Sequence, residues 1–461
     1  MSTPAPPTPW GTTTALAAGA ATGVLLLAVG LVLGRADVAL LGVPALISAT
    51  WGWTHRPEAP VTAEVHDDPD APPGTLGARL HLHGPAGAQT VRVRVVAPGG
   101  ETAERVLHLT GGARDVGVRA RSARTGALPA FRVDLLAYGV EGVQEHGPVT
   151  TTGAPLLVLP RPAALRDLPS SPRLRGLAGP RTSRRPGDGS ELRDVAAFGP
   201  GDSARRVDWR ATARRSPDLD TLYVRRTYGT AEATVVLVVD SRDDVGSDLT
   251  TWGAGAPRHD EPTSLDLARH AAASVAQTVL DAGDRVALDD LGRLHRPVRP
   301  GGGRRHLRRV LHGLALARPV GEPSARLRAP QVPAGSAVYV FSTLLDDGAP
   351  RLARQWHDAG HVVVVVDTLP PVSLADAEPR VTVAWRIARR EREDRVATLR
   401  RAGVDVVRWT PHLPGRHDGR VGPTEPDRPH DDTLGPATAL HLAARRRSRD
   451  RRTTTTARNA R

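Results

Sequence analysis

Two apolar runs close to the N-terminus constrain this chain more than any other feature. Residues 12–33 are almost wholly apolar or small, and residues 38–53 form a second, shorter apolar run that contains Pro44. The first run is long enough to cross the hydrocarbon layer of a membrane, roughly 30 Å thick, as a helix. The pattern predicts a two-helix transmembrane hairpin over residues 12–55, preceded by an N-terminal tail over residues 1–11.

The flanks of these runs bear on the orientation of the hairpin. A cleaved signal peptide is the alternative for the first run, but no Lys or Arg precedes Thr12 and a second apolar run follows at once. Trp51 and Trp53, followed by Arg56, are typical of a membrane interface. Two spans place both chain ends on one side. Arg56 and the Arg-bearing body favour the cytoplasm, whereas Arg35 in the turn favours the opposite side. We expect a multi-pass inner (plasma) membrane protein with a cytoplasmic body.

The basic composition suggests a nucleic-acid function, but the distribution of the charge disfavours it. The formal net charge is +13, and all 62 basic residues are Arg, alongside 46 Gly and 41 Pro, as expected of a GC-rich genome. The Arg runs fall in tails and linkers, away from the stacking aromatic side chains that nucleic-acid surfaces combine with cations. The absence of Cys excludes disulfides, thiolate nucleophiles and zinc sites built on thiolates.

Residues 58–160 have the pattern of a small β-sandwich. Short stretches of alternating polar and apolar residues are separated by Pro and Gly turns, as in an antiparallel sandwich. Residues 161–188 are rich in Pro, Arg, Ser and Gly, which is typical of a linker. The strands expected in the sandwich are 78–82, 90–96, 106–109, 116–119 and 131–137.

Residues 231–411 change to alternating strands and helices. The run 234–239 is apolar, β-branched and followed by Asp240, as expected of a buried parallel strand. This order predicts an α/β fold with a doubly wound, mostly parallel sheet. Residues 412–461 are expected to be a disordered basic tail, apart from a short helix near 437–444. Further strands are expected at 285–288, 337–341, 362–366 and 404–408, and helices at 265–280, 304–314, 351–359 and 389–402.

The most informative stretch of the chain is the signature region, residues 189–230. Its first part, residues 189–214, reads GSELRDVAAFGPGDSARRVDWRATAR and resembles the signature of domain-of-unknown-function family 58. Two positions depart from the family pattern, because Ala196 replaces the usual Arg and Phe198 replaces Tyr. The positions in register are Glu191, Leu192, Pro200, Gly201, Asp202, Arg205, Arg206, Val207, Asp208, Trp209, Ala213 and Arg214.

The resemblance implies more than the signature itself. Proteins of this family commonly have an N-terminal hairpin, a β-rich insert and a von Willebrand factor A-like sheet directly after the signature, so the fold expected for residues 231–411 is von Willebrand A-like. The resemblance also implies a partnership with a MoxR-type AAA+ ATPase in the assembly or maturation of other protein complexes.

The signature residues allow two interpretations. Pro200 and Gly201 form a tight-turn dipeptide, since Pro fixes φ and Gly tolerates positive φ. Asp202 and Asp208 can pair with neighbouring Arg side chains. An Asp–Arg network buried around Trp209 would brace the domain, because charged groups leave water only when they are paired. Alternatively, the same residues form a partner-binding face.

The resemblance also raises the question of a metal site. Von Willebrand A domains often bind Mg²⁺ through an Asp-x-Ser-x-Ser loop, a Thr and an Asp, and hard oxygen ligands at strand ends suit this cation. In the first loop of this chain, residues 240–244, Arg242 and Asp244 replace the two serines. The second loop is expected at residues 301–304, without Thr, and in the third Thr343 stands where Asp is expected.

The site is therefore expected to be degenerate. A guanidinium beside the cation position would repel the cation or replace it. If Mg²⁺ binds, its ligands are expected to be Asp240, Asp243 and Asp244.

Three classes of function are compatible with these features to different degrees. We expect a non-enzymatic interaction protein, because the sequence has no Gly-x-Ser-x-Gly elbow, phosphate loop or dinucleotide fingerprint, and no nucleophile–base arrangement or small-molecule site. The alternative is a metal-dependent ligand-binding receptor that uses the edge of the von Willebrand A-like sheet. An enzyme acting at the membrane has only scattered His and Asp residues in its favour.

Overall fold

The computed structural model describes most of the chain and divides it into two compact units, Met1–Val158 and Leu159–Arg461. Each unit has its own buried hydrophobic core. The described residues are 9–109, 112–166, 168–169, 179, 181–252, 257–292, 297–320, 329–375, 377–409 and 438–446.

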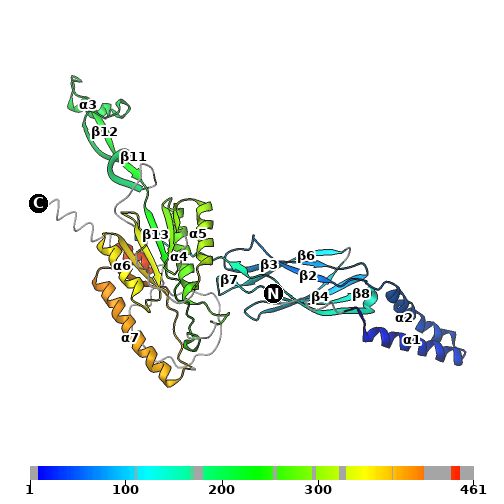
Figure 1. Ribbon diagram of the computed structural model, residues 1–461. Helices are drawn as coiled ribbons and strands as arrows, with labels where there is room; N and C mark the ends of the chain where they lie inside the picture. Colours follow the sequence, from blue (N-terminus) through cyan, green and yellow to red (C-terminus); the bar gives the residue numbers. More distant parts are fainter. Residues whose placement is uncertain are drawn as a thin grey trace. The chain divides into compact units, whose positions relative to one another are not determined.

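The first unit begins with two apolar helices, α1 (Thr14–Val32) and α2 (Ala36–Thr54), drawn in dark blue in Figure 1. Both are 19 residues long and are long and apolar enough to cross a membrane. Small residues let their backbones approach, as is common between membrane helices. A Cβ added at Gly42 would lie 2.4 Å from the carbonyl oxygen of Gly23. The predicted apolar helical hairpin is therefore confirmed.

Two facing antiparallel sheets form the rest of the first unit. Inward-pointing residues of both sheets, such as Leu80 and Leu135, share one core. The predicted sandwich is found, with additional strands that the sequence did not reveal, among them one that reads QEHGPVTTT and is largely polar. A short 3₁₀ helix, η1 (Val140–Gly142), links two of the strands.

The larger sheet has the order β1-β9-β8-β4-β5, the smaller β2-β3-β6, and a third pair is β10-β7. The strands are β1 (Gly11–Thr12), β2 (Thr62–Asp67), β3 (Thr75–His83), β4 (Ala88–Val96), β5 (Thr102–His108), β6 (Ala113–Arg121), β7 (Gly126–Leu128), β8 (Arg132–Gly139), β9 (Gln144–Thr152) and β10 (Leu156–Val158).

The second unit is built on a six-stranded sheet with the order β15-β14-β13-β16-β17-β18. All neighbouring pairs are parallel except β14 and β15, which are antiparallel. The mixed α/β prediction is confirmed, whereas the von Willebrand A-like assignment stays a prediction. The strands are β13 (Thr234–Val239), β14 (Arg285–Asp290), β15 (Val298–Gly301), β16 (Ala337–Ser342), β17 (Val362–Asp367) and β18 (Asp405–Arg408).

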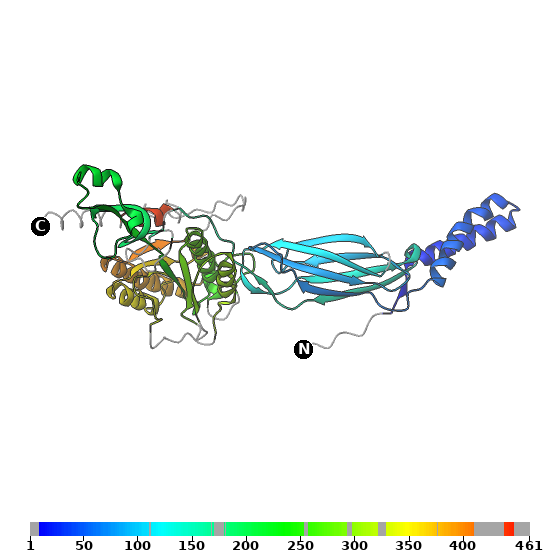
Figure 2. The same ribbon diagram turned by 90° about the horizontal axis from the view of Figure 1, so that it is seen from above.

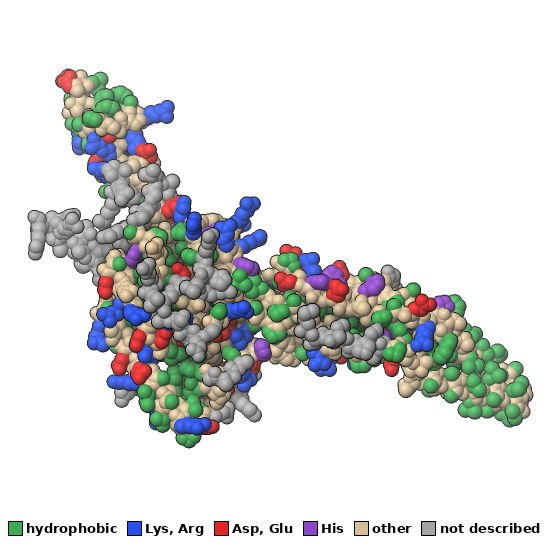
Figure 3. All heavy atoms as spheres, in the orientation of Figure 1, with side chains coloured by type: hydrophobic (Ala, Val, Ile, Leu, Met, Phe, Trp, Pro, Cys, Tyr) green, Lys and Arg blue, Asp and Glu red, His purple; other side chains and the backbone are tan. Residues whose placement is uncertain are grey.

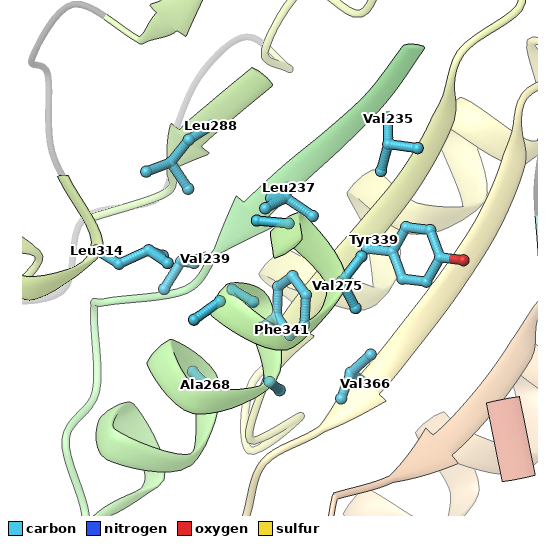
Figure 4. Packing of buried hydrophobic residues seen from close by; sticks show 14 of the residues in the cluster. Val235, Leu237, Val239, Ala268, Val275, Leu288, Leu314, Tyr339, Phe341 and Val366 are labelled. Atoms are coloured by element: carbon cyan, nitrogen blue, oxygen red, sulfur yellow. The ribbon is translucent and has the colours of Figure 1, made fainter. Parts of the chain in front are cut away.

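Helices cover both faces of this sheet. Val235, Leu237 and Val239 of β13 share a core with the helices α4 and α5, and Figure 4 shows this packing. The alternate residues Val236 and Val238 share a second core with α6 and α7. Such alternation follows from the period of two in a strand. The helices are α4 (Ser264–Asp281), α5 (Arg304–Leu316), α6 (Gly348–Asp358) and α7 (Pro379–Arg401), and a 3₁₀ helix, η3 (Leu249–Thr251), lies in the loop before α4.

Two segments of this unit differ from the sequence predictions, and a third agrees with them. Helix α7 begins at Pro379 rather than at residue 389, since Pro is favourable in the first turn of a helix. The predicted linker, residues 161–188, is in part structured: the Tyr339 hydroxyl donates to the Pro169 carbonyl at 2.7 Å, and a strand begins at Arg181. Residues 438–446 form the short helix expected there, with Leu440 buried in the core of α4. The rest of the predicted tail lies outside the described residues.

The signature region forms an antiparallel ribbon that ends in a small cap (Figures 1 and 2). The ribbon pairs β11 (Arg181–Ala197) with β12 (Tyr223–Ala231). The segment between them, residues 198–222, is called the signature cap below. It contains the 3₁₀ helix η2 (Ala204–Arg206) and the helix α3 (Trp209–Arg215).

Candidate functional site

Polar side chains gather where neighbouring parallel strands of the second unit end. Asp240 follows β13, Asp290 ends β14, Ser342 ends β16 and Asp367 ends β17. The carboxyl ends of parallel strands meet at one edge of a sheet, which is the usual position of binding sites in open α/β folds. This carboxyl edge is therefore the first candidate site.

Arg242 occupies the centre of this edge. Its guanidinium donates to both oxygens of Asp240, at 2.8 and 2.9 Å, and to both oxygens of Asp346, at 2.6 and 3.0 Å. The Ser342 hydroxyl also donates to Asp240, at 2.8 Å. Burial alone would lower the pKa of Arg242, but the two carboxylates raise it above its usual value. Arg242 is thus held as a permanent cation between two carboxylates.

The residues predicted to hold a metal do not fit a divalent cation as they are arranged. The Arg242 guanidinium fills the position between the carboxylates. Asp244 instead accepts a hydrogen bond of 3.4 Å from the backbone of Leu265, in the first turn of α4. Among the residues that the structure describes, no three His, Asp or Glu side chains form a group that could hold a metal ion. The expectation that a guanidinium replaces the cation agrees with this geometry.

Asp240, Arg242, Ser342 and Asp346 form the Arg242 cluster. Asp243 lies beside this cluster, but its carboxyl group is not paired with the guanidinium. Burial first, and then the neighbouring carboxylates of Asp240 and Asp346, raise the pKa of its carboxyl to about 6, against the opposing effect of Arg242. Within the described part of the chain, Asp243 makes no hydrogen bond or ion pair. Asp240, by contrast, is paired directly with Arg242.

The second loop of the predicted metal site was placed wrongly. Because β15 runs antiparallel to β14, Gly301 pairs with Val286 at the opposite end of the sheet. Gly303, with φ of +81°, precedes α5 there and allows the tight entry to the helix. The loop after β14 takes its place at the carboxyl edge, where the Ser241 hydroxyl donates to Asp290 at 2.6 Å.

Sequence reasoning missed several acidic residues of this edge, namely Asp290, Asp346 and Asp367. Asp346 was overlooked because the comparison with the metal motif stopped at Thr343. Asp367, at the end of β17, is buried and forms an ion pair with Arg392 of α7, whose side chain is 14% exposed. A usable signal was present, since each of these Asp residues ends or closely follows an apolar strand.

Asp202 braces the turn at the start of the signature cap. Its carboxylate accepts from the Arg226 guanidinium at 2.9 and 3.2 Å and from the backbone N–H of Gly199 at 3.0 Å. Arg226 first, and then the Gly199 N–H, lower the pKa of Asp202. Pro200 and Gly201 form the predicted turn, with Gly201 at a φ of +91°.

Asp208 and Arg206 tie the cap to the ribbon. Asp208 is the N-cap of α3 and accepts from the backbone N–H of Ala211 at 3.0 Å. Arg206 forms an ion pair with Asp188 of β11 and donates to the Thr227 hydroxyl of β12 at 3.3 Å. These contacts support the bracing interpretation for the charged residues.

Trp209 does not lie within that network. It is 65% exposed, so the expectation of Asp–Arg pairs buried around this side chain is wrong. It is the first residue of α3, directly after the N-cap residue Asp208. Phe198 and Leu219, also in the signature cap, are exposed as well. Exposed Arg side chains without a hydrogen bond or ion pair to the described residues accompany them, namely Arg205, Arg210 and Arg214.

The remaining signature residue, Glu191, is exposed on β11. The structure therefore separates the signature into two groups: side chains that hold the ribbon and cap together, and an exposed aromatic and basic surface on the cap. Exposed aromatic and Arg residues of this kind are enriched among the residues that dominate protein–protein binding.

These features define an α/β protein with an apolar helical hairpin near its N-terminus and a capped ribbon before its central strand. Residues 194–402, from within β11 to just past α7, match the family model described as Protein of unknown function DUF58. A comparison with curated proteins found no match to the chain.

Proposed function

We propose that this protein is a membrane-anchored protein-interaction module that works with a MoxR-type AAA+ ATPase in the assembly or maturation of other protein complexes. The observation that carries the proposal is the exposure of Trp209 on a cap that is itself firmly braced. A large apolar side chain held in place and exposed to water is a binding group rather than a core group.

The features of the second unit are consistent with binding rather than catalysis. At the carboxyl edge the charged groups are engaged with one another, Asp240 and Asp346 with Arg242, and Asp367 with Arg392. We therefore propose a non-enzymatic role for a von Willebrand A-like domain, with the ATPase supplying nucleotide hydrolysis.

The helices α1 and α2 supply the proposed anchor. In this arrangement they cross the inner (plasma) membrane as a hairpin and leave the β-sandwich and the second unit in the cytoplasm, where ATP is available to an AAA+ ATPase. The small residues between them, such as Gly23 and Gly42, favour helix–helix packing within a bilayer.

The test is affinity capture of the full-length protein from gently solubilised native membranes, with and without ATP, followed by mass spectrometry. We expect the wild type to recover a MoxR-type ATPase and Trp209→Ala to lose it. Val106→Ala is the matched control, because Val106 is exposed to a similar extent in the first unit. The proposal fails if no AAA+ protein is recovered, or if Trp209→Ala captures as much of it as the control does.

A metal-dependent receptor is the second candidate function. It would use the carboxyl edge and require a divalent cation bound by Asp240 and its neighbours. The position of Arg242 between Asp240 and Asp346 disfavours this candidate. A melting temperature that rises with Mg²⁺ and falls with EDTA in the wild type would restore it.

A further inference from the structure

Helix α7 carries a second apolar surface, distant in sequence from the signature cap. Val383 and Ile387 are 54% and 58% exposed, and Ala384 between them is exposed too. Spacings of three and four place these residues side by side on one face of the helix. Hydrophobic side chains gather over this end of α7 in the space-filling view (Figure 3).

The other face of the same helical segment is fixed to the body of the unit. Trp385 packs edge to face against Trp252, with 5.4 Å between the ring centroids, and Leu399 further along the helix is fully buried. Val383, Ala384 and Ile387, called the apolar stripe below, therefore lie on a helix that is packed against the rest of the unit. A β-branched pair one turn apart, held open to water, is a surface that a partner can cover.

Opposite charges flank the stripe at its two ends. Arg380 lies one turn before Ala384, and Glu391 lies one turn after Ile387. Arg380 forms an exposed ion pair with Glu378 at 2.6 Å, and the exposed Glu391 forms an ion pair at 3.5 Å with Arg395, whose own side chain is 18% exposed. The exposed pair contributes little, and the Glu391 contact is long while Arg395 also pairs with Asp347, so either charge can take a new partner at small cost.

The order of the stripe, basic–apolar–apolar–acidic, is self-complementary in an antiparallel arrangement. The pairs Arg380 with Glu391 and Ala384 with Ile387 share the same midpoint on the helix. A two-fold axis through that midpoint places Arg380 opposite the partner's Glu391 and Ala384 opposite the partner's Ile387. A two-fold interface requires one surface patch to complement itself in this way.

We propose that two copies of this protein associate through their α7 helices, paired antiparallel about the midpoint between Ala384 and Ile387. The apolar stripes cover each other, and two symmetry-related Arg380–Glu391 contacts fix the direction and register. This association involves neither the signature cap nor the ATPase of the proposed function, so it stands or fails independently.

The absence of Cys from the chain allows a direct cross-linking test. At 1.5 Å rise per residue, the two copies of residue 384 lie about 5 Å apart along the paired helices, whereas the two copies of residue 397 lie about 35 Å apart. Ala384→Cys and Ala397→Cys are therefore a matched pair, since both alanines are exposed on α7. The full-length variants are treated in isolated membranes with a short bis-maleimide.

We expect a product of twice the chain mass with Ala384→Cys and at most a trace with Ala397→Cys. In the Ala384→Cys background, Arg380→Glu or Glu391→Arg alone places like charges together at both ends and weakens association about fivefold. The double variant restores the opposite pairing and the cross-link. Since both side chains are exposed, unchanged melting curves serve as the folding control.

Three results overturn the proposal: equal cross-linking of the two cysteine variants, cross-linking of Ala384→Cys to a different protein only, or failure of the charge-reversed double variant to recover what each single variant loses.

Discussion

Replacing Arg242 by Ala tests the physical account of the carboxyl edge most directly. The side chains of Arg242 and Asp240 are 7% and 3% exposed, so the substitution leaves a buried carboxylate without its counter-charge. Breaking a buried ion pair by removing one partner costs about 3–5 kcal/mol. The Asp346 side chain is 44% exposed and is rehydrated, so its loss of a partner adds little.

The expected consequence is a large fall in thermal stability. A loss of 1 kcal/mol lowers the melting temperature of a domain of about 150–250 residues by roughly 2–4 °C, so Arg242→Ala should lower it by roughly 6–20 °C. The assay follows tryptophan fluorescence during heating of the full-length protein in detergent, because Trp356 of α6 is buried in the core of the second unit. Arg308→Ala is the control, since Arg308 is exposed on α5.

A second arm of the same experiment adds Mg²⁺. Without the guanidinium, Asp240, Asp346 and the Ser342 hydroxyl are oxygen ligands around an open position, which suits a hard cation. We expect Mg²⁺ to raise the melting temperature of Arg242→Ala and to leave the wild type unchanged. A fall for Arg242→Ala no larger than that of Arg308→Ala would refute the view that the guanidinium holds this edge together.

Three further predictions concern other parts of the chain. Burial raises the pKa of Asp243 to about 6, so its ionisation in the folded state lowers stability as pH rises from about 4 to about 6. Asp243→Asn should lose less stability over that window and be about 1–3 kcal/mol more stable at pH 7, measured by urea unfolding; equal pH dependence in both proteins would contradict this. Asp202→Ala should leave Arg226 and the turn without their acceptor and speed limited proteolysis of the signature cap without changing the core melting transition. Gly42→Leu should separate α1 from α2, because a Cβ at this position already meets the carbonyl oxygen of Gly23. The variant should be recovered with the membrane fraction in a smaller amount than the wild type. Gly19→Leu, which has open space around it, should be recovered like the wild type.

The fold was predictable where local pattern and tertiary environment agree. The all-Val run that became β17 is buried on both faces, and β13 matches its predicted bounds, because a strand covered on both sides needs no polar residue. β15 reads Val-Arg-Pro-Gly and has no such signal, since it is a short edge strand. Its antiparallel direction moved the loop at residues 301–304 to the opposite edge, which composition alone does not reveal.

The candidate sites were predictable in identity but not in arrangement. The sequence identified Asp240 and Arg242 as neighbours and indicated that a guanidinium can replace a cation. It did not reveal Asp346, because the contact joins residues far apart in the chain. It named Trp209 but placed it inside a network, since a large apolar residue beside a carboxylate suits a core as well as a surface.

The ribbon that carries the signature cap has a mechanical consequence. β12 ends at Ala231 and β13 begins at Thr234, so extended backbone runs almost without interruption from the cap to Asp240. β13 is hydrogen-bonded on both sides, to β14 and to β16. A pull on the cap along this direction loads both hydrogen-bond ladders in shear, where many bonds resist together instead of opening one at a time. Tension applied at Trp209 is thus delivered to the strand that ends at the Arg242 cluster, with little compliance between the two.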